Sequence, residues 1–260
     1  MELRMYYRKF LEDEALRFIL IILVFSISAF VFAKDREDLS AAHKFYEEGK
    51  YEEAIATYSS VAQKIPNGHI YFNIANCYFR LNELGKALFY YKKAQKLIPR
   101  DPELVANINY VRSLAKDKIE DRAMSSITKK AFFWYYLFNL KTLVIITVII
   151  NFLFCCTIFF KFWKKDIEFF QWGTYILFSI NIIFIITTVA KFYYENYTRD
   201  GVVIVEETDV RSGFGIGGSV LFKLHTGAEF SVLETNNEWA KIELIDEKKG
   251  WVSSKDIIYE

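Results

Sequence analysis

One short stretch of this 260-residue chain, GFGIGG at residues 213–218, has the spacing of a cofactor-binding motif. Its glycines follow the pattern G-x-G-x-x-G, and Glu238 lies at about the offset of the acid that contacts the ribose in dinucleotide-binding proteins. That motif needs a strand before the glycines and a helix after them, whose N-terminus meets the phosphate. Here VLFKL follows, which predicts a strand. We therefore expect an exposed, mobile loop with no bound cofactor.

Other residues with catalytic potential are few and scattered. The three histidines form no H-x-x-x-H pair, the three cysteines form no C-x-x-C motif, and neither G-x-S-x-G nor a P-loop occurs. We predict that the chain is not an enzyme and that it has no catalytic, cofactor-binding or metal-binding residues. Lysine and arginine (33) nearly balance aspartate and glutamate (32), which gives no reason to expect nucleic acid as a partner.

The apolar residues are concentrated in long runs. Residues 142–160 and 169–190 contain no charge, and each run is long enough to cross the ~30 Å hydrocarbon core of a bilayer as a helix. Aromatic residues flank both runs, as they do at membrane interfaces. We predict two transmembrane helices rather than a buried soluble hairpin. The connection at residues 161–168 carries Lys161, Lys164 and Lys165, so the positive-inside rule predicts that it is cytoplasmic.

A third apolar run, residues 18–33, follows several basic residues near the N-terminus. It predicts a signal peptide at residues 1–33, although the acidic Glu12, Asp13 and Glu14 are unusual there and leave an uncleaved signal anchor as the alternative. Both interpretations export the chain beyond residue 33. We therefore expect a protein of the bacterial inner membrane whose two soluble regions lie on the periplasmic or extracytoplasmic side.

Two stretches of the N-terminal half share residue types at a spacing of 33. Residues 41–66 read AAHKFYEEGKYEEAIATYSSVAQKIP, and residues 74–99 read IANCYFRLNELGKALFYYKKAQKLIP. Small residues that let helices approach, aromatics that fill the gap beside them and a final proline recur at matching positions: Ala42 and Ala75, Phe45 and Tyr78, Ala54 and Ala87, Tyr58 and Tyr91, Val61 and Ala94, and Pro66 and Pro99. The pattern predicts two tetratricopeptide repeats.

A capping helix is predicted after the second repeat, with Leu104, Ile108, Val111 and Leu114 on one stripe. The repeats and this helix would form a domain at residues 34–120, joined to the first span by an interfacial linker at residues 121–141. In such repeats the first helix of each pair lines a concave face. We predict a partner-binding groove there, to which five residues contribute: His43, Tyr46, Phe72, Asn76 and Phe79.

Residues 200–260 form short strands separated by turns. The predicted strands are 202–205, 220–224, 229–233, 239–242 and 250–252, which indicates a small all-β barrel. The order of landmarks resembles a bacterial Src-homology-3-like domain: Val210 and Arg211 before a loop, Gly227 and Gly250 in turns, and Trp239 and Trp251 packing the barrel. The resemblance implies binding of cell-wall peptides or proteins. The acidic and aromatic residues that lead into a polyproline groove are missing.

The order of segments along the whole chain resembles the BatE family of the Bacteroides aerotolerance operon. YEEAI (51–55), KALFYYKKA (86–94) and DPELVANINY (101–110) fit the repeat region of that family. The resemblance implies a membrane complex with von Willebrand A-type proteins and a MoxR-type ATPase, linked to oxidative-stress tolerance or envelope integrity. We expect a membrane-anchored scaffold with a helical repeat domain, a two-helix hairpin and a β barrel; a peptidoglycan-binding or envelope-sensing protein is the alternative.

Overall fold

The computed structural model describes residues 38–117, 130–163, 168–215 and 217–260, and the side chains of 160–171 are not described. The predicted export segment at 18–33 and the side chains of Lys161, Lys164 and Lys165 lie outside the described residues. The chain divides into two compact units, Met1–Pro66 and Asn67–Glu260. Each unit is described by itself.

The first unit contains the pair of helices predicted for the first repeat. Residues 38–47 are helical, and α2 spans Tyr51–Lys64. Gly49 has a φ of 76°, the left-handed conformation that glycine adopts without strain, and it makes the turn between the helices. Lys64 at the end of α2 lies 3.8 Å from Asp38 at the start of the preceding helix. Ala42, Ala54 and Tyr58 are buried, as small and aromatic packing positions should be.

The second unit begins with three helices, α3 (Gly68–Arg80), α4 (Leu84–Leu97) and α5 (Pro102–Leu114). Side chains cap two of their N-termini: Asn67 accepts a hydrogen bond from the amide of His69, and Asp101 accepts from those of Glu103 and Leu104. The small residues Ala75 and Ala87 are fully buried, which allows α3 and α4 to pack closely.

The predicted stripe of α5 is correct for three of its four members. Leu104, Ile108 and Val111 are buried, whereas Leu114 is 48% exposed. Leu114 is the last residue of α5, and the chain continues in an extended conformation at Ala115. Leu114 therefore lies at the very end of the helix and stays largely exposed.

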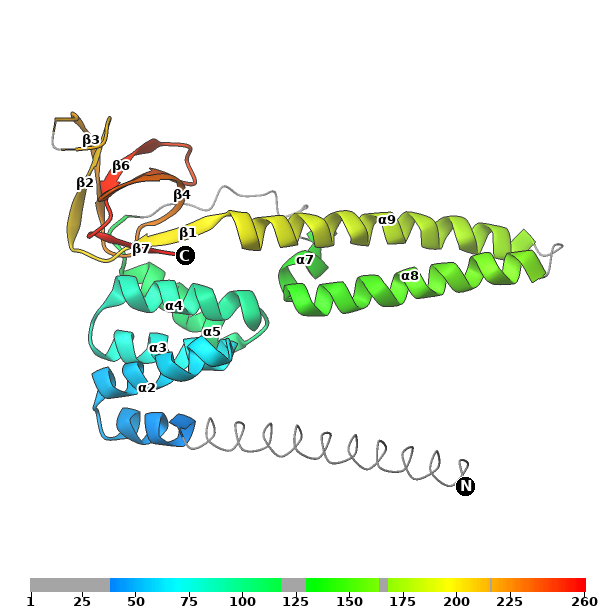
Figure 1. Cartoon of the computed structure of the whole chain (residues 1–260), viewed down its shortest axis with the longest axis horizontal. Helices are drawn as coiled ribbons and strands as arrows, with labels where there is room; N and C mark the ends of the chain where they lie inside the picture. Colours follow the sequence, from blue (N-terminus) through cyan, green and yellow to red (C-terminus); the bar gives the residue numbers. More distant parts are fainter. Residues whose placement is uncertain (1–37, 118–129, 164–167, 216) are drawn as a thin grey trace, which may run out of the picture. The chain divides into compact units, whose positions relative to one another are not determined.

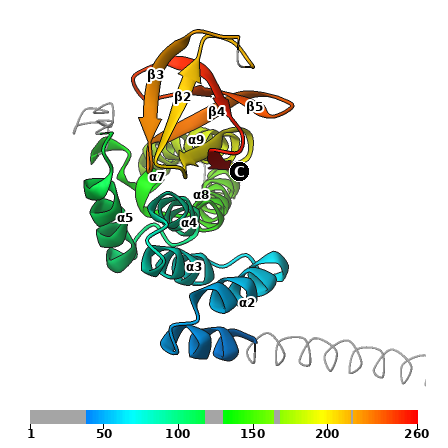
Figure 2. The ribbon, with the colours of Figure 1, turned by 90° about the vertical axis from the view of Figure 1, so that its left-hand side faces the viewer.

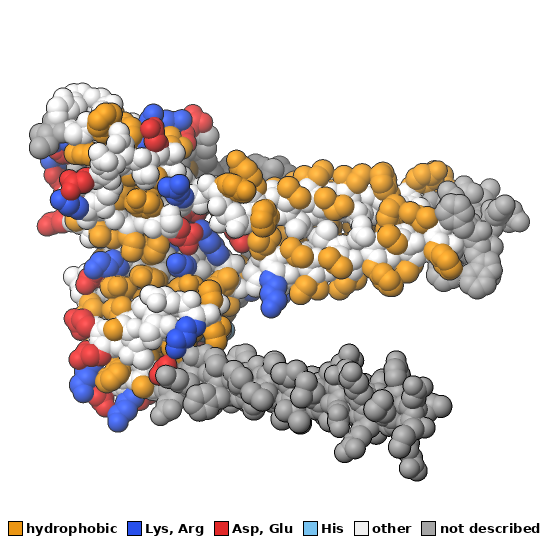
Figure 3. All heavy atoms as spheres, viewed as in Figure 1, with side chains coloured by type: hydrophobic (Ala, Val, Ile, Leu, Met, Phe, Trp, Pro, Cys, Tyr) orange, Lys and Arg blue, Asp and Glu red, His pale blue; other side chains and the backbone are white. Residues whose placement is uncertain are grey.

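Two long apolar helices, α8 (Leu140–Trp163) and α9 (Glu168–Tyr197), lie side by side as a hairpin (Figure 1). The spans Leu140–Phe159 and Trp172–Tyr197 are long and apolar enough to cross a membrane, and few of their residues are buried within the protein. Hydrophobic side chains cover the visible face of the hairpin (Figure 3). The Thr147 and Thr188 hydroxyls join the helices through a 2.7 Å hydrogen bond.

A short aromatic helix, α7 (Phe133–Leu137), precedes the hairpin and packs on α9. The Lys191 ammonium of α9 donates hydrogen bonds of 2.7 Å to the carbonyls of Tyr135 and Phe138, at the C-terminal end of α7. The Trp134 and Phe184 rings stack with centroids 5.4 Å apart. These contacts fix the aromatic helix at the base of the hairpin.

The C-terminal β domain follows α9 after a single intervening residue, Thr198. Its strands are β1 (Arg199–Val203), β2 (Glu207–Arg211), β3 (Val220–His225), β4 (Glu229–Asn236), β5 (Trp239–Glu243), β6 (Lys249–Ser253) and β7 (Ile257–Tyr259). They form one sheet in the order β3-β2-β6-β5-β4-β1-β7, with antiparallel pairing throughout. The core consists of buried side chains that alternate along the strands, such as Val210, Ala240, Ile242 and Val252.

Helix α4 lies between α3 and the β domain (Figures 1 and 2). Its contact with β1 is close. A Cβ on Gly85 would lie 2.3 Å from the Val203 carbonyl oxygen and 2.8 Å from the Ile204 Cα. Only a residue without a side chain allows the helix to approach the strand this closely.

Candidate functional site

The three predicted groove residues of α3 lie on one face, and the structure turns that face toward α4 and α5. The Phe72 ring lies 5.8 Å from that of Tyr91, and the Phe79 ring lies 5.9 Å from that of Tyr110. The Asn76 Oδ1 accepts hydrogen bonds from the Tyr91 hydroxyl at 2.6 Å and from the Asn107 Nδ2 at 3.4 Å. Phe72, Asn76 and Phe79 are therefore partly engaged in packing, which leaves them half-buried.

The other two predicted groove residues belong to the first unit. His43 is exposed and lies 3.4 Å from Glu47 one turn along, and Tyr46 makes an edge contact with Tyr51. Sequence reasoning missed Asn107 and Tyr110, which α5 adds to the face of α3; the Tyr110 side chain is 56% exposed. The two residues are three apart on the capping helix, on the flank of the buried stripe of Leu104 and Ile108, and this spacing was the available signal.

The β domain carries a polar groove of about 440 Å³. Three pairs of side chains line it: Arg211 with Asp209 at 2.8 Å, Lys223 with Glu207, and the Thr208 hydroxyl with Asp256 at 2.6 Å. Trp239 and Ser253 complete the lining. The groove thus presents both signs of charge beside an indole ring. Such a surface can bind a zwitterionic ligand.

The glycine-rich stretch is the loop between β2 and β3, as predicted. The amide of Ser212 donates to the carbonyl of Ser219 at 2.9 Å, which closes the loop, and Gly215 has a φ of 90°. The Phe214 side chain is 62% exposed, and the edge of its ring contacts Trp251. A strand follows the loop, so the described residues offer no helix N-terminus for a dinucleotide phosphate. The mobility of the loop stays a prediction.

A buried carboxylate joins the β domain to the helices. Glu229 of β4 is 8% exposed, and it accepts hydrogen bonds from Lys92 of α4 at 2.5 Å and from the guanidinium of Arg112 of α5 at 2.5 and 2.9 Å. Burial alone raises the pKa of such a carboxyl, but the two cations outweigh it and hold the Glu229 pKa below 4.5. The carboxylate is therefore ionised at neutral pH.

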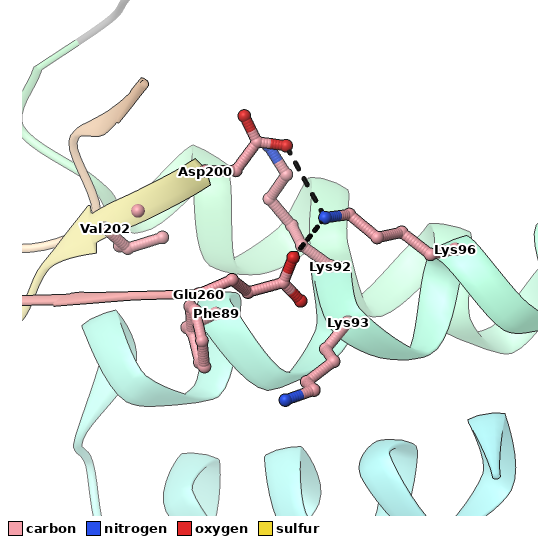
Figure 4. Close-up of a pocket in the computed structure, with 8 residues that line it drawn as sticks. Phe89, Lys92, Lys93, Lys96, Asp200, Val202 and Glu260 are labelled. Carbon is pink, nitrogen blue, oxygen red and sulfur yellow. Dashed lines mark hydrogen bonds and ion pairs between the residues drawn. The ribbon is translucent and has the colours of Figure 1, made fainter. Parts of the chain in front are cut away.

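Two further contacts join the same parts of the second unit. Lys96 of α4 pairs with Glu260 and lies 3.8 Å from Asp200 of β1 (Figure 4). The His225 Nδ1 lies 3.0 Å from Asp117, and its Nε2 lies 2.9 Å from the Lys116 ammonium and 3.3 Å from Glu207. The helices and the β domain are thus held together at several points by charged side chains.

Two family models match parts of the chain. Residues 206–258, from β2 into β7, match the bacterial SH3 domain, and residues 70–101, which include most of α3 and all of α4, match the tetratricopeptide repeat. The chain contains a tetratricopeptide repeat and a bacterial SH3 domain. No curated protein compared with the chain matches it. The first predicted repeat lies outside the match, and the structure supplies its two helices.

The structure shows how the predicted landmarks of the SH3 domain are placed. Val210 and Trp251 are buried, and Arg211 and Trp239 are half-buried. Gly227 has a φ of 88° in the turn between β3 and β4.

The prediction that Gly250 lies in a turn is wrong. Gly250 lies inside β6, where it pairs with Ile242. A Cβ there would lie 2.4 Å from the Val210 Cγ1, so the glycine is needed for packing between strands.

At the repeat positions, Ala75, Ala87 and Tyr91 are buried, whereas Phe45 and Tyr78 are half-buried. Burial raises the pKa of the Tyr78 hydroxyl to about 12. Pro66 and Pro99 follow the ends of α2 and α4, where proline cannot continue a helix. Among the described residues, no group of three or more His, Cys, Asp or Glu side chains could hold a metal ion.

Proposed function

We propose that this protein is a membrane-anchored scaffold that binds other proteins through its repeat and its SH3 domain on the extracytoplasmic face. The observation that carries the proposal is the order of the parts. The repeat precedes a hairpin of two exposed apolar helices, and the SH3 domain follows it directly. Two spans joined by a short connection return the chain to the side from which it came, so both domains are available to the same partners.

The resemblance to the BatE family supports a finer proposal. The partners would be von Willebrand A-type proteins that work with a MoxR-type ATPase, in an envelope complex linked to aerotolerance or oxidative stress. The α3–α5 face, with half-buried Phe79 and Asn107 and exposed Tyr110, is the surface that we propose for a partner segment. Aromatic side chains with polar neighbours are typical of the residues that contribute most to protein interfaces.

Affinity purification after cross-linking of intact membranes tests the scaffold. We expect von Willebrand A-type proteins to be recovered with the tagged full chain. Tyr110→Ala should reduce recovery, whereas Leu233→Ala, which truncates an apolar side chain of similar exposure on β4, should not. Equal recovery with both variants would exclude the α3–α5 face, and recovery of none of these proteins would contradict the proposed complex.

The sidedness is tested separately. A single cysteine placed at exposed Lys255 of the SH3 domain, and another at exposed His43, should both react with a membrane-impermeant maleimide in intact spheroplasts. Cys77, Cys155 and Cys156 are replaced by serine in both variants, so that the introduced thiol alone can react. Labelling only after lysis would place the two domains in the cytoplasm and reject the proposal.

The charged groove of the SH3 domain favours a second candidate function, the binding of peptidoglycan. Stem peptides carry both carboxylates and amines, and the groove presents both cations and carboxylates. The test is sedimentation of the detergent-solubilised full chain with purified peptidoglycan. Lys223→Glu should weaken sedimentation, whereas Lys255→Glu, which reverses a similarly ion-paired lysine outside the groove, should not. Failure of the wild-type protein to sediment would reject this candidate.

A further inference from the structure

A second cavity lies at the base of the hairpin, between the end of α4 and the beginning of α8. Its volume is about 270 Å³. One wall consists of residues 97–101, the other consists of residues 137–139 with Thr142, and His69 of α3 completes the lining. We refer to it as the base pocket. It lies outside both surfaces considered above.

Hydrogen bonds hold the two walls of the base pocket in place. The Asn139 Nδ2 donates to the Leu97 carbonyl at 2.7 Å, which ties the walls together, and its Oδ1 accepts from the Thr142 amide at 2.9 Å. The Lys191 ammonium of α9 donates a hydrogen bond of 2.7 Å to the Phe138 carbonyl. The pocket is therefore built before any ligand arrives, which reduces the ordering cost of binding.

Two cations, Arg100 in the lining of the base pocket and Lys141 next to a lining residue, have no carboxylate partner among the described residues. The Arg100 guanidinium carbon lies 5.2 Å from the centre of the Phe138 ring, a cation–π contact that holds the group at the pocket. Lys141 is exposed in the first turn of α8, beside Thr142. Asp101 is the carboxylate of the lining, and its Oδ1 is occupied by the amides of Glu103 and Leu104.

The base pocket lies where the apolar span begins. Leu140 is the first residue of the span, and the next turns of α8 expose Val144, Ile145 and Val148. A ligand that fits has an anionic group at one end and hydrocarbon at the other. We infer that the base pocket binds the phosphate of a phospholipid headgroup through Arg100 and Lys141, with an acyl chain along α8. The inference rests on the proposed insertion of the hairpin into a membrane.

Photo-cross-linking tests this site. The full chain is reconstituted into phosphatidylcholine nanodiscs that contain a small fraction of phosphatidylglycerol with a photoreactive headgroup, and labelled peptides are identified by mass spectrometry. We expect labelling within residues 97–101 and 137–142. Because one basic residue near an anionic lipid surface contributes about 1 kcal/mol, Arg100→Glu should lower the yield at least about fivefold.

Arg199→Glu is the matched control, because Arg199 is an exposed arginine two residues after the end of α9, at the same end of the hairpin. It should leave the labelling of the base pocket unchanged. Equal losses in both variants, or no label in these peptides, would overturn the inference. Soluble glycerol phosphate at the same concentration as the lipid probe should not abolish the labelling. If it does, the inference is overturned, because a phosphate without a lipid would then be enough for binding.

Extraction of membranes with sodium carbonate separates this inference from the proposed function. Wild-type protein that is extracted by carbonate contradicts membrane insertion itself. Protein that resists extraction but takes no label in the base pocket contradicts the lipid site alone. If the Arg100→Glu protein resists extraction, its lower cross-linking yield is due to weaker lipid binding in the base pocket rather than to failed membrane insertion.

Discussion

The two sides of the SH3 domain use their charged residues differently. On the side that faces α4 and α5, the Glu229 side chain is 10% exposed and is bound by two cations from the helices. On the groove side, Glu207 pairs with Lys223, and these two side chains are 44% and 53% exposed. A buried pair is costly to break, whereas an exposed pair contributes under about 1 kcal/mol and can exchange partners at little cost. The first side is suited to fixed internal docking and the second to ligand binding.

The largest effect is expected from a substitution of Gly85, on the side of the SH3 domain that faces the helices. In Gly85→Val the new side chain would meet the backbone of Val203 and Ile204, which cannot move aside as a flexible side chain can. We expect a loss of about 3 kcal/mol in unfolding free energy and rapid hydrogen exchange of β1, measured on the full chain in detergent. Gly213→Ala, at a position where nothing lies within 4 Å, is the control and should have little effect. Unchanged exchange of β1 in Gly85→Val would mean that α4 and β1 do not pack in solution.

The next effect is expected at Arg112. Arg112→Ala leaves the buried Glu229 carboxylate with Lys92 alone, which should cost about 2 kcal/mol, less than for a completely unpaired buried charge. Thermal unfolding of the full chain measures it. Lys255→Ala removes an exposed ion pair and serves as the matched control, with a loss under about 0.5 kcal/mol. Equal losses in the two variants would contradict the difference between buried and exposed pairs.

The pH dependence of the unfolding free energy tests the same carboxylate, and the expected change is smaller. The folded-state pKa of Glu229 is lowered from 4.5, so its contribution to stability is fully present above 4.5 and is lost as the pH falls through the folded pKa. Glu229→Gln cannot titrate at this position. The stability difference between wild type and Glu229→Gln should therefore shrink as the pH is lowered below 4.5. A difference that grows on acidification would have the wrong sign for an ionised, paired Glu229.

The smallest effect concerns the loop on the groove side. Gly215→Ala places a Cβ on a residue with a φ of 90°, where an L-residue is strained by about 1 kcal/mol. Gly213 lies in the same loop without positive φ, so Gly213→Ala should be nearly neutral. Chemical denaturation of the full chain measures both. The SH3 domain should stay docked in each variant, with β1 protected from exchange, because the loop lies away from α4.

The sequence predicted the helices and strands better than it predicted the contacts between them. The 33-residue spacing identified the helices, because burial of Ala54, Ala75 and Ala87 requires small residues at recurring positions. Short runs of β-branched and aromatic residues between turn residues located most strands. The start of β1 was missed because Arg199, Asp200 and Gly201 have the types of turn residues. Gly201 pairs with Phe230 in the sheet, and glycine is required there because a Cβ would lie 2.4 Å from the Phe230 ring.

The contacts between the helices and the β domain depend on residues that lie far apart in the chain. Glu229 lies 117 positions from Arg112 and 137 from Lys92, and no local pattern relates them. Glu229 was included in a predicted strand, but one sequence cannot show that its carboxylate points toward the helices. The same holds for the polar groove, whose lining residues are brought together by the register of β2 with β3 and of β5 with β6. That the chain is not an enzyme stays a prediction.

Thr198 alone separates the end of α9 at Tyr197 from the start of β1 at Arg199. Its amide still bonds to the carbonyl of Tyr194, so the helical hydrogen bonding continues up to the strand. β1 in turn pairs with both β4 and β7. The helix therefore continues into the sheet without an intervening loop. A rotation of α9 about its axis should therefore move β1, and with it either the polar groove or the ion pairs that join Glu229 to Lys92 and Arg112.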